Sequence, residues 1–427
     1  MSRTAEYDIV VIGAGAAGIG AARLLAQSGR SFVVLEARER VGGRAWSKDS
    51  GRGFPIDLGC EWMHSATTNP LVPLARELGV EVEEYGEFWA AKWNEAKLGS
   101  EAYKRFRGVI AALFEKAEAL AAAGGPDVAL GDLLPAGEPW RPTIEAICGW
   151  MTGARLDQVS AIDLGRNNEM PVNWRLPIGY GGLIETMASG LPILLSTAVQ
   201  SVDWRDGPIA VETRRGTIAA RKLVVTVPSS LIASEKIRFA PALPEDKLEA
   251  AASLPLGADL KLFLAVEGEP FGPPQDRQIH SRYDRVESAH FHLHPFGRPL
   301  AMAYFGGDLA RDLEAQGLAA IADFAEGELV FNFGARVRGH FKPLAASGWM
   351  ADPWAGGAYS FARPGATQAR ATLARPLQER IFFAGEATSL SDFSTAHGAY
   401  MSGLAAAEAA LAAFAAAPAL APKGPLR

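Results

Sequence analysis

The sequence predicts an α/β fold in which one domain is assembled from separate parts of the chain and a second domain is inserted into it. An apolar run, residues 8–12, breaks into glycines, and a helical stretch at 19–27 and a second apolar run at 31–36 follow. Near the other end, residues 379–386 indicate another strand that runs into a glycine and an acid. Because both ends carry this kind of element, we expect them to meet in one domain.

The turn after the first strand has the spacing of a dinucleotide-binding motif. Residues 13–18 read Gly-Ala-Gly-Ala-Ala-Gly. Gly13 permits the tight turn, Gly15 lets the backbone approach a pyrophosphate, and Gly18 lets the helix pack on the strand. The N-terminus of the helix directs its free N–H groups at the phosphates. Glu36 ends the second strand about 20 residues beyond the glycines, where an acid accepts hydrogen bonds from ribose hydroxyls.

The glycine turn alone does not distinguish a nucleotide site from an ordinary strand–helix–strand unit with small-residue packing, nor NAD from FAD. Residues 37–44, Ala-Arg-Glu-Arg-Val-Gly-Gly-Arg, place a glycine pair and an arginine just beyond the acid. They add backbone donors and one fixed charge near the pyrophosphate. This stretch resembles the FAD-binding oxidoreductases that share the amine oxidase fold.

Composition and charge fit a globular enzyme. The 427 residues suffice for two domains with large cores, and the formal net charge of -6 argues against a nucleic-acid partner. Two cysteines make neither a disulfide framework nor a four-cysteine zinc site, so we expect a reducing, cytoplasmic location. Asp8 and the glycine turn interrupt the first apolar stretch, so we do not expect it to be the apolar core of a signal peptide. The alanine-rich helix expected at 403–417 is too short to span a bilayer, so we expect no membrane partner.

Turn and strand signals predict the helices and strands of the rest of the chain. A helix is expected at 101–123, ended by a Gly-Gly-Pro sequence, and another at 183–189 after a turn at 177–182. Short strands are expected at 198–203, 209–213, 222–228, 258–266, 289–294 and 300–305. These signals predict a discontinuous, Rossmann-type FAD-binding domain of residues 1–79, 176–250 and 346–427. The inserted α+β substrate domain, with a mixed sheet plus helices, would comprise residues 80–175 and 251–345.

Several longer stretches resemble the flavin-containing amine oxidases. Residues 349–365 are similar to the flavin-facing segment of that family, and residues 383–388 and 394–403 are similar to its terminal flavin motif. Residues 255–261, Pro-Leu-Gly-Ala-Asp-Leu-Lys, resemble its lysine-bearing strand. Residues 57–71 resemble its polyamine oxidase branch. The resemblance runs from the first strand to the last helix, and it is weakest near 80–175 and 267–345, where substrate choice is expected.

Lys261 is the predicted catalytic residue. It lies in an otherwise apolar run, where a lysine is costly to bury unless it is hydrogen-bonded. The resemblance implies that this lysine holds a water against flavin N5 and assists reoxidation by oxygen. The alternative is that Lys261 faces solvent on an edge strand, which strand alternation permits.

Three residues are predicted to bind substrate: Tyr359, Thr395 and His64. The resemblance places Tyr359 beside the flavin ring, where its face steers an amine nitrogen; the alternative is a packed core tyrosine. Monoamine oxidases complete this cage with a second tyrosine where this chain has Thr395, which favours the polyamine oxidase branch or an unassigned bacterial one. His64 matches a polar residue at the substrate mouth of polyamine oxidases, although lone histidines are often structural.

The resemblance implies FAD bound without a covalent link, because Ala358 stands where mammalian-type monoamine oxidases carry the flavin-bonding cysteine. It also implies that Glu386 accepts hydrogen bonds from the ribityl chain, and that the 395–396 backbone begins a helix whose dipole favours negative charge on the reduced flavin. The predicted cofactor-binding residues are Gly13, Ala14, Gly15, Ala16, Gly18, Glu36, Ala37, Arg38, Gly43, Arg44, Val199, Trp349, Trp354, Gly385, Glu386, Thr395 and Ala396.

Three histidines alternate near the end of an expected strand. His290, His292 and His294 would share one face at intervals of about 7 Å. A metal site is one interpretation, but no further ligand cluster lies nearby, so we expect a polar sheet face and no metal.

The sequence therefore predicts an FAD-dependent amine oxidase. A neutral small-molecule amine gives a hydride to flavin N5, the imine hydrolyses to an aldehyde or ketone, and molecular oxygen becomes hydrogen peroxide. The enzyme would be a monomer or homodimer. One alternative is an L-amino acid oxidase, which usually places an arginine at the position of Trp62. The other is a flavin-binding protein without amine turnover, which an intact Lys261 and Tyr359 disfavour.

Overall fold

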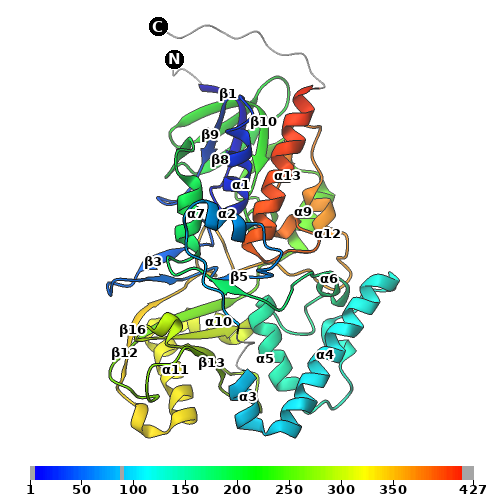
Figure 1. Cartoon of the computed structure of the whole chain (residues 1–427). Helices are drawn as coiled ribbons and strands as arrows, with labels where there is room; N and C mark the ends of the chain where they lie inside the picture. The colour runs from blue at the N-terminus through cyan, green and yellow to red at the C-terminus, as the bar shows by residue number, and fades with distance from the viewer. Residues whose placement is uncertain (1–4, 87–90, 416–427) are drawn as a thin grey trace.

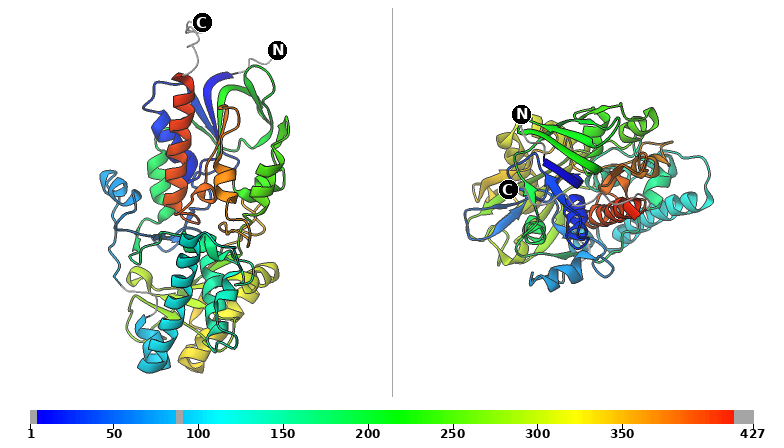
Figure 2. Two further views of the ribbon diagram at one scale, coloured as in Figure 1. Left: turned by 90° about the vertical axis from the view of Figure 1, so that its right-hand side faces the viewer. Right: turned by 90° about the horizontal axis from the view of Figure 1, so that it is seen from above.

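The fold is described by a computed structural model that covers residues 5–86 and 91–415. The molecule has two halves (Figure 1). The blue N-terminal and red C-terminal elements lie together in one half, and the yellow and cyan segments form the other. The side view in Figure 2 shows the same division, with the blue N-terminal strand and the red C-terminal helix in the half opposite the yellow helices.

The half that holds both ends is built on an eight-stranded sheet. At its centre β1 (Ala5–Ile12) pairs in parallel with β2 (Phe32–Leu35) and with β10 (Gly216–Val225). β17 (Ile381–Phe383) also pairs in parallel with β10, so the two ends of the chain meet in one sheet, as the sequence predicts. The other strands are β7 (Ile193–Leu194), β8 (Val199–Asp203), β9 (Ile209–Thr213) and β11 (Arg238–Ala240).

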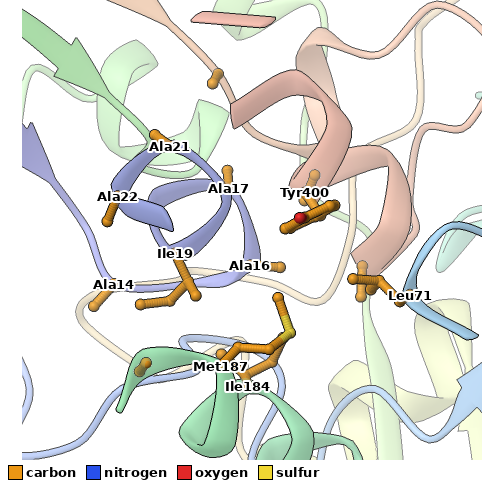
Figure 3. Packing of buried hydrophobic residues seen from close by; sticks show 14 of the residues in the cluster. Ala14, Ala16, Ala17, Ile19, Ala21, Ala22, Leu71, Ile184, Met187 and Tyr400 are labelled. Carbon is orange, nitrogen blue, oxygen red and sulfur yellow. The ribbon is translucent and has the colours of Figure 1, made fainter. Parts of the chain in front are cut away.

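Small residues let the helices of this half pack closely. Ala16 and Ala17 of α1 (Ala16–Leu25) face Tyr400 of α13 (Ala396–Ala415) (Figure 3). A Cβ on Gly403 would lie 1.9 Å from the carbonyl oxygen of Ala17, so only glycine fits there. Also in this half are β3 (Ser47–Asp49), β4 (Pro55–Asp57), α2 (Leu71–Glu77), α7 (Tyr180–Ala188), α8 (Ser229–Ala233), α9 (Glu245–Ala252), α12 (Ala369–Ala374) and η4 (Glu386–Thr388).

The other half contains a five-stranded sheet in the order β13-β14-β15-β12-β16. Its strands are β12 (Asp259–Val266), β13 (Arg277–His280), β14 (His290–Leu293), β15 (Leu300–Gly306) and β16 (Phe341–Ala346). Every pairing between these strands is antiparallel, where the sequence predicted a mixed sheet. Short links such as residues 294–299 cannot make the crossover that a parallel pair needs.

Helices cover this second sheet and extend beside it (Figure 1). They are α3 (Ala91–Leu98), α4 (Ser100–Ala123), α5 (Arg141–Thr152), α6 (Ala161–Gly165), α10 (Gly307–Gln316), α11 (Leu318–Phe333), and the short η1 (Leu130–Leu133), η2 (Pro295–Gly297) and η3 (Ala335–Val337). β5 (Trp62–Met63) and β6 (Trp174–Arg175) form a separate antiparallel pair. The exact domain boundaries stay predictions.

Helices α1, α4 and α7 begin at Ala16, Ser100 and Tyr180, earlier than the expected 19, 101 and 183. α7 starts at Tyr180 rather than 183, because Gly181 packs where a Cβ would lie 2.3 Å from the backbone nitrogen of Ser47. α13 starts at Ala396, ahead of the alanine-rich run that begins at 403 and where the resemblance implied a helix start. The Thr395 hydroxyl accepts a hydrogen bond from Gly398 N at 3.0 Å and caps the helix. The last predicted residues of α13, 416–417, lie outside the described residues. Within residues 5–86 and 91–415, no helix combines the length and apolar content needed to cross a membrane.

Candidate active site

One cavity of about 830 Å³ extends from the glycine turn, residues 13–18, to the second sheet. Gly13, Gly15 and Glu36 line one end, and Lys261, Tyr304 and Tyr359 line the other. Volumes of this size are typical of cofactor and substrate sites. The cavity therefore joins the predicted nucleotide site to the predicted substrate site in a single space.

The glycine turn has the shape that a dinucleotide requires. Gly13 has φ +102, and a Cβ on Gly18 would lie 1.8 Å from the carbonyl oxygen of Gly13. The nearest atom to a Cβ on Gly15 is the Gly42 carbonyl oxygen at 3.9 Å, so the side of Gly15 that borders the cavity is open. The backbone at Gly15 can thus come close to a ligand. Gly18, in contrast, allows close packing within the turn.

Glu36 is held in place by the backbone around the turn. Its two carboxylate oxygens accept hydrogen bonds from Ala14 N at 2.8 Å and from Arg38 N at 2.9 Å. The side chain is 4% exposed and lines the cavity. Its remaining lone pairs suit ribose hydroxyls, and the open side of Gly15 suits a pyrophosphate. The residues present therefore fit an adenine dinucleotide such as FAD.

Of the predicted cofactor-binding residues, all but Ala14 and Gly18 line this cavity. Ala14 is fully buried, and it contributes its backbone N–H to Glu36. The cofactor contacts themselves stay predictions.

Replacing Glu36 with Ala should weaken FAD retention without unfolding the protein. The loss of a charged acceptor costs about 1.5–3 kcal/mol, which is about 10- to 150-fold in the dissociation constant. Equilibrium dialysis against FAD measures this change, with circular dichroism as the check on folding. Equal affinity in the variant and the wild type would remove Glu36 from the site.

Glu386 is already engaged by protein groups. Arg44 Nη1 donates to Glu386 Oε1 at 2.9 Å and to the Ala358 carbonyl at 2.6 Å, and Ser360 Oγ donates to Glu386 Oε2 at 2.6 Å. Burial pushes the pKa of Glu386 upward, but Arg44, the Ser360 hydrogen bond and Arg370 outweigh it and hold the pKa below its usual range. Arg44 thus ties the segment after the second strand to both C-terminal motifs.

Lys261 is buried in the interior of the second sheet. β12 lies between β15 and β16, so the interpretation of an edge strand facing solvent is wrong. Lys261 Nζ donates to Glu61 Oε2 at 2.7 Å, to Gly59 O at 2.9 Å and to Asp57 O at 3.3 Å. Burial pushes the pKa of Glu61 upward, but Lys261 and His292 outweigh it and hold the pKa below its usual range. The ammonium is therefore fixed in the cavity wall by a buried carboxylate.

Tyr359 has a second tyrosine beside it, although Thr395 does not supply an aromatic ring. The hydroxyls of Tyr359 and Tyr304 lie 2.9 Å apart, and the Tyr359 hydroxyl donates to the Trp150 carbonyl. The Thr395 hydroxyl donates to Asp392 O at 2.6 Å and caps α13, so its side chain is engaged in structure. All four of Tyr359, Tyr304, Trp150 and Thr395 line the cavity.

His64 lies where the cavity approaches solvent. Its Nδ1 is 2.8 Å from Glu169 Oε1, and the two side chains are 36% and 37% exposed. Burial pushes the pKa of His64 down, but the Glu169 carboxylate outweighs it and raises the pKa. The predicted placement at a cavity mouth agrees with this geometry, while the role in substrate binding stays a prediction.

The histidines of β14 have polar partners. His290 Nε2 lies 3.0 Å from Gln278 Oε1, and His292 Nε2 lies 2.7 Å from Asp276 Oδ1; both histidines line the cavity. β14 ends at Leu293, and His294 follows it with a φ of 51. His294 is therefore outside the strand and does not line the cavity, contrary to the expectation that it shares a face with His290 and His292. In the described part of the chain, no group of three or more His, Cys, Asp or Glu side chains is arranged to hold a metal ion.

Asp259, Glu61 and Tyr304 are among the cavity residues that sequence reasoning missed. Asp259 carries the same signal that identified Lys261, a charge in an apolar strand, and stands two positions before it on the same face. Glu61 lies in a loop and Tyr304 in an unremarkable strand. Nothing in their local sequence marks them as neighbours of Lys261 and Tyr359.

Comparisons with known proteins agree with this geometry. The sequence profile of the family described as "Flavin containing amine oxidoreductase" matches residues 16–164 and 156–411. Polyamine oxidase 2 of Arabidopsis thaliana is 28% identical, over 95% of this chain and 88% of its own length. Polyamine oxidase 3 of Oryza sativa subsp. japonica is 30% identical, over 93% of this chain and 88% of its own. Lysine-specific histone demethylase 2 of Homo sapiens is 28% identical over 93% of this chain, which spans 52% of that relative.

Solved structures show the same fold. A triple mutant of putrescine oxidase superposes with a TM-score of 0.78 at 19% identity, covering 96% of this chain and 100% of that one. Cyclohexylamine oxidase from Brevibacterium oxydans IH-35A gives a TM-score of 0.77 at 21% identity, covering 96% and 99%. With the profile match spanning most of its length, the chain belongs to the flavin-containing amine oxidoreductase family, as its sequence motifs predict, and is an enzyme of that class.

Proposed function

We propose that this enzyme binds FAD without a covalent link and oxidises a small-molecule amine. Overall, the amine, oxygen and water give an aldehyde or ketone, hydrogen peroxide, and ammonia or a smaller amine. When bound, FAD supplies the redox chemistry, taking a hydride from the carbon next to nitrogen and passing electrons to oxygen. The single cavity that joins the glycine turn to the pocket of Lys261 and Tyr359 supports this proposal, because one continuous space has room for a cofactor beside a substrate.

The protein residues orient the amine and keep the site dry. The aromatic faces of Tyr359, Tyr304 and Trp150 line the inner cavity, where they attract an amine nitrogen and exclude water. Lys261 holds a positive charge in the cavity wall through its pairing with Glu61. That charge favours the negative charge that develops as oxygen is reduced. The free thiols of Cys60 and Cys148 suit the reducing, cytoplasmic location that we propose.

The L-amino acid oxidase alternative lacks its carboxylate anchor here. Trp62 stands at the position of the expected arginine and stacks on His292, with ring centroids 5.8 Å apart. The guanidinium of Arg175 lies over the Trp62 ring, 5.6 Å from its centroid. It is paired with Glu83 and Asp276, and Arg175 does not line the cavity. No observation favours this alternative over an amine without a carboxylate.

Oxygen consumption and peroxide formation with a panel of amines and L-amino acids test the proposal. Purified holoenzyme should produce one peroxide per oxygen with at least one amine and none with L-amino acids. A matched reaction with catalase should return half of the oxygen consumed. Peroxide formation from L-amino acids alone would contradict the proposal.

The non-covalent link gives a separate prediction. Ala358 offers no thiol to the flavin, so acid precipitation of the yellow protein should release all of the FAD into the supernatant. Absorbance of the supernatant and the pellet measures the partition. Flavin that stays with the washed pellet would contradict non-covalent binding, and NAD as the bound nucleotide would overturn the proposal.

A further inference from the structure

The pair of Lys261 and Glu61 is electrically neutral as a unit. The ammonium lies 2.7 Å from Glu61 Oε2, and both side chains are 9% exposed. Opposite charges this close act as a dipole, so the carboxylate cancels much of the field of the ammonium a few ångströms away. A third charge beside the pair therefore decides how strongly this pocket favours the negative charge that develops as oxygen is reduced.

His292 of β14 is the titratable group next to this pair. Its Nδ1 lies 3.7 Å from Glu61 Oε1, whereas Lys261 binds the other carboxylate oxygen. Its Nε2 lies 2.7 Å from Asp276 Oδ1. The imidazole is 1% exposed and thus has a carboxylate at each ring nitrogen. An imidazole can donate to two acceptors only when both nitrogens carry a proton, which is its cationic form.

One cation and two aromatic rings also face the imidazole. Arg175 Nη1 lies 3.1 Å from His292 Nε2 and opposes a charge on the ring, but Arg175 Nη2 donates to Asp276 Oδ2 at 2.8 Å and to Glu83 Oε2 at 2.6 Å. The centroids of the Trp62 and Tyr85 rings lie 5.8 Å and 6.1 Å from that of the imidazole. Arg175 is therefore offset by two carboxylates, and the rings add no charge.

The balance of these groups favours the imidazolium. Burial lowers the pKa of His292, but the hydrogen bonds and charges of Asp276 and Glu61 outweigh it and raise the pKa. The side chains of Asp276 and Glu83 are 22% and 37% exposed, so solvent screens them more than it screens the buried groups around Lys261.

We propose that His292 carries a positive charge at neutral pH and thereby sets the net charge of the Lys261 pocket. With His292 protonated, Lys261, Glu61 and His292 sum to one positive charge; with His292 neutral they sum to zero. His292 is thus a positioning residue for oxygen reduction that acts through Glu61 and Lys261. This inference rests on the proposed oxidation with oxygen as acceptor.

NMR of the holoenzyme with isotope-labelled histidine measures the charge of His292 directly. Its signal is identified by its loss in His292→Gln. The titration midpoint should lie above the ordinary value of about 6.5. Asp276→Asn keeps an acceptor for Nε2 but removes the charge, so the midpoint should fall by about one unit or more. A wild-type midpoint at or below the ordinary value would overturn the proposal.

Stopped-flow reoxidation of dithionite-reduced holoenzyme across the same pH range tests the consequence. The wild-type rate should fall about tenfold as the pH rises through the NMR midpoint of His292, because the pocket then loses its net charge. His292→Gln should be independent of pH, near the slow high-pH limit. In Asp276→Asn the fall should move to lower pH together with the NMR midpoint. A merely structural role would lower the rate without moving this profile.

His290→Gln is the matched control. His290 lies on the same strand and lines the same cavity, but its Nε2 is 3.0 Å from the neutral Gln278, and burial lowers its pKa to about 3. The wild-type profile should persist in this variant. A slope that persists in His292→Gln would overturn the proposal and assign the pH dependence to another group, such as Asp57, whose pKa burial raises to about 7.

Two outcomes separate this inference from the proposed function. Reoxidation that is independent of pH in the wild type, with amine oxidation intact, contradicts this inference alone. A reduced flavin that oxygen does not reoxidise at any pH contradicts the proposed function, and the NMR midpoint still decides the charge of His292. If His292→Gln does not fold, the signal that moves in Asp276→Asn identifies His292, and a kinetic midpoint that does not follow it overturns the proposal.

Discussion

Replacing Lys261 with Met should slow the reoxidation of reduced holoenzyme by oxygen about a hundredfold, a loss of about 3 kcal/mol in transition-state stabilisation. Methionine keeps most of the volume and loses the charge and its donors. Flavin reduction by an amine should change only a few-fold. Stopped-flow mixing of dithionite-reduced protein with oxygen measures the rate without knowledge of the natural substrate. Equal reoxidation rates in the two proteins would contradict the role of Lys261.

Lys261→Met needs a control, because it leaves the buried Glu61 without the cation that pairs with it. A stranded charge is costly and shifts nearby structure. Glu61→Gln removes that charge, and the double variant removes both. The double variant should reoxidise as slowly as Lys261→Met alone. Recovery of the wild-type rate in the double variant would show that the stranded carboxylate, and not the missing lysine, slows the reaction.

Replacing Arg370 with Met should lower the free energy of unfolding by about 3–5 kcal/mol, because it strands a buried carboxylate. Arg370 is 2% exposed and donates to both oxygens of Asp163 at 2.8 Å and to Ser360 Oγ at 2.9 Å. Urea denaturation followed by tryptophan fluorescence measures the change.

Arg375→Met is the matched control for this loss. Its ion pair with Asp246 is on the surface, where the two side chains are 56% and 52% exposed, so we expect a change within about 1 kcal/mol. Similar losses in Arg370→Met and Arg375→Met would contradict the stabilising role of the buried pair.

The fold could be predicted where local sequence carries the signal. β9 occupies residues 209–213 as expected from alternation, and α4 ends at Ala123 before a left-handed Gly124. The start of α7 could not be predicted, because it depends on a contact between distant segments. Gly181 packs against Ser47, and Gly403 packs against Ala17. Glycine is a poor helix former in isolation, and tertiary packing overrides that preference here.

The site, like the fold, could be predicted only where the local sequence carries a signal. Lys261 is identifiable because a charge interrupts an apolar strand. Its partner Glu61 lies 200 residues away, and no periodicity relates the two. The neighbour of Tyr359 also escaped prediction, because Tyr304 reaches it only through the pairing of β12 with β15. Contacts of this kind exist only once both halves are folded.

Anaerobic titration of the oxidised holoenzyme with amines tests most directly whether this cavity brings an amine to the flavin. A productive amine should bleach the flavin absorbance to completion with one equivalent per flavin, and oxygen should restore it. Flavin that keeps its absorbance with every amine tested, while dithionite still bleaches it, would contradict the central claim.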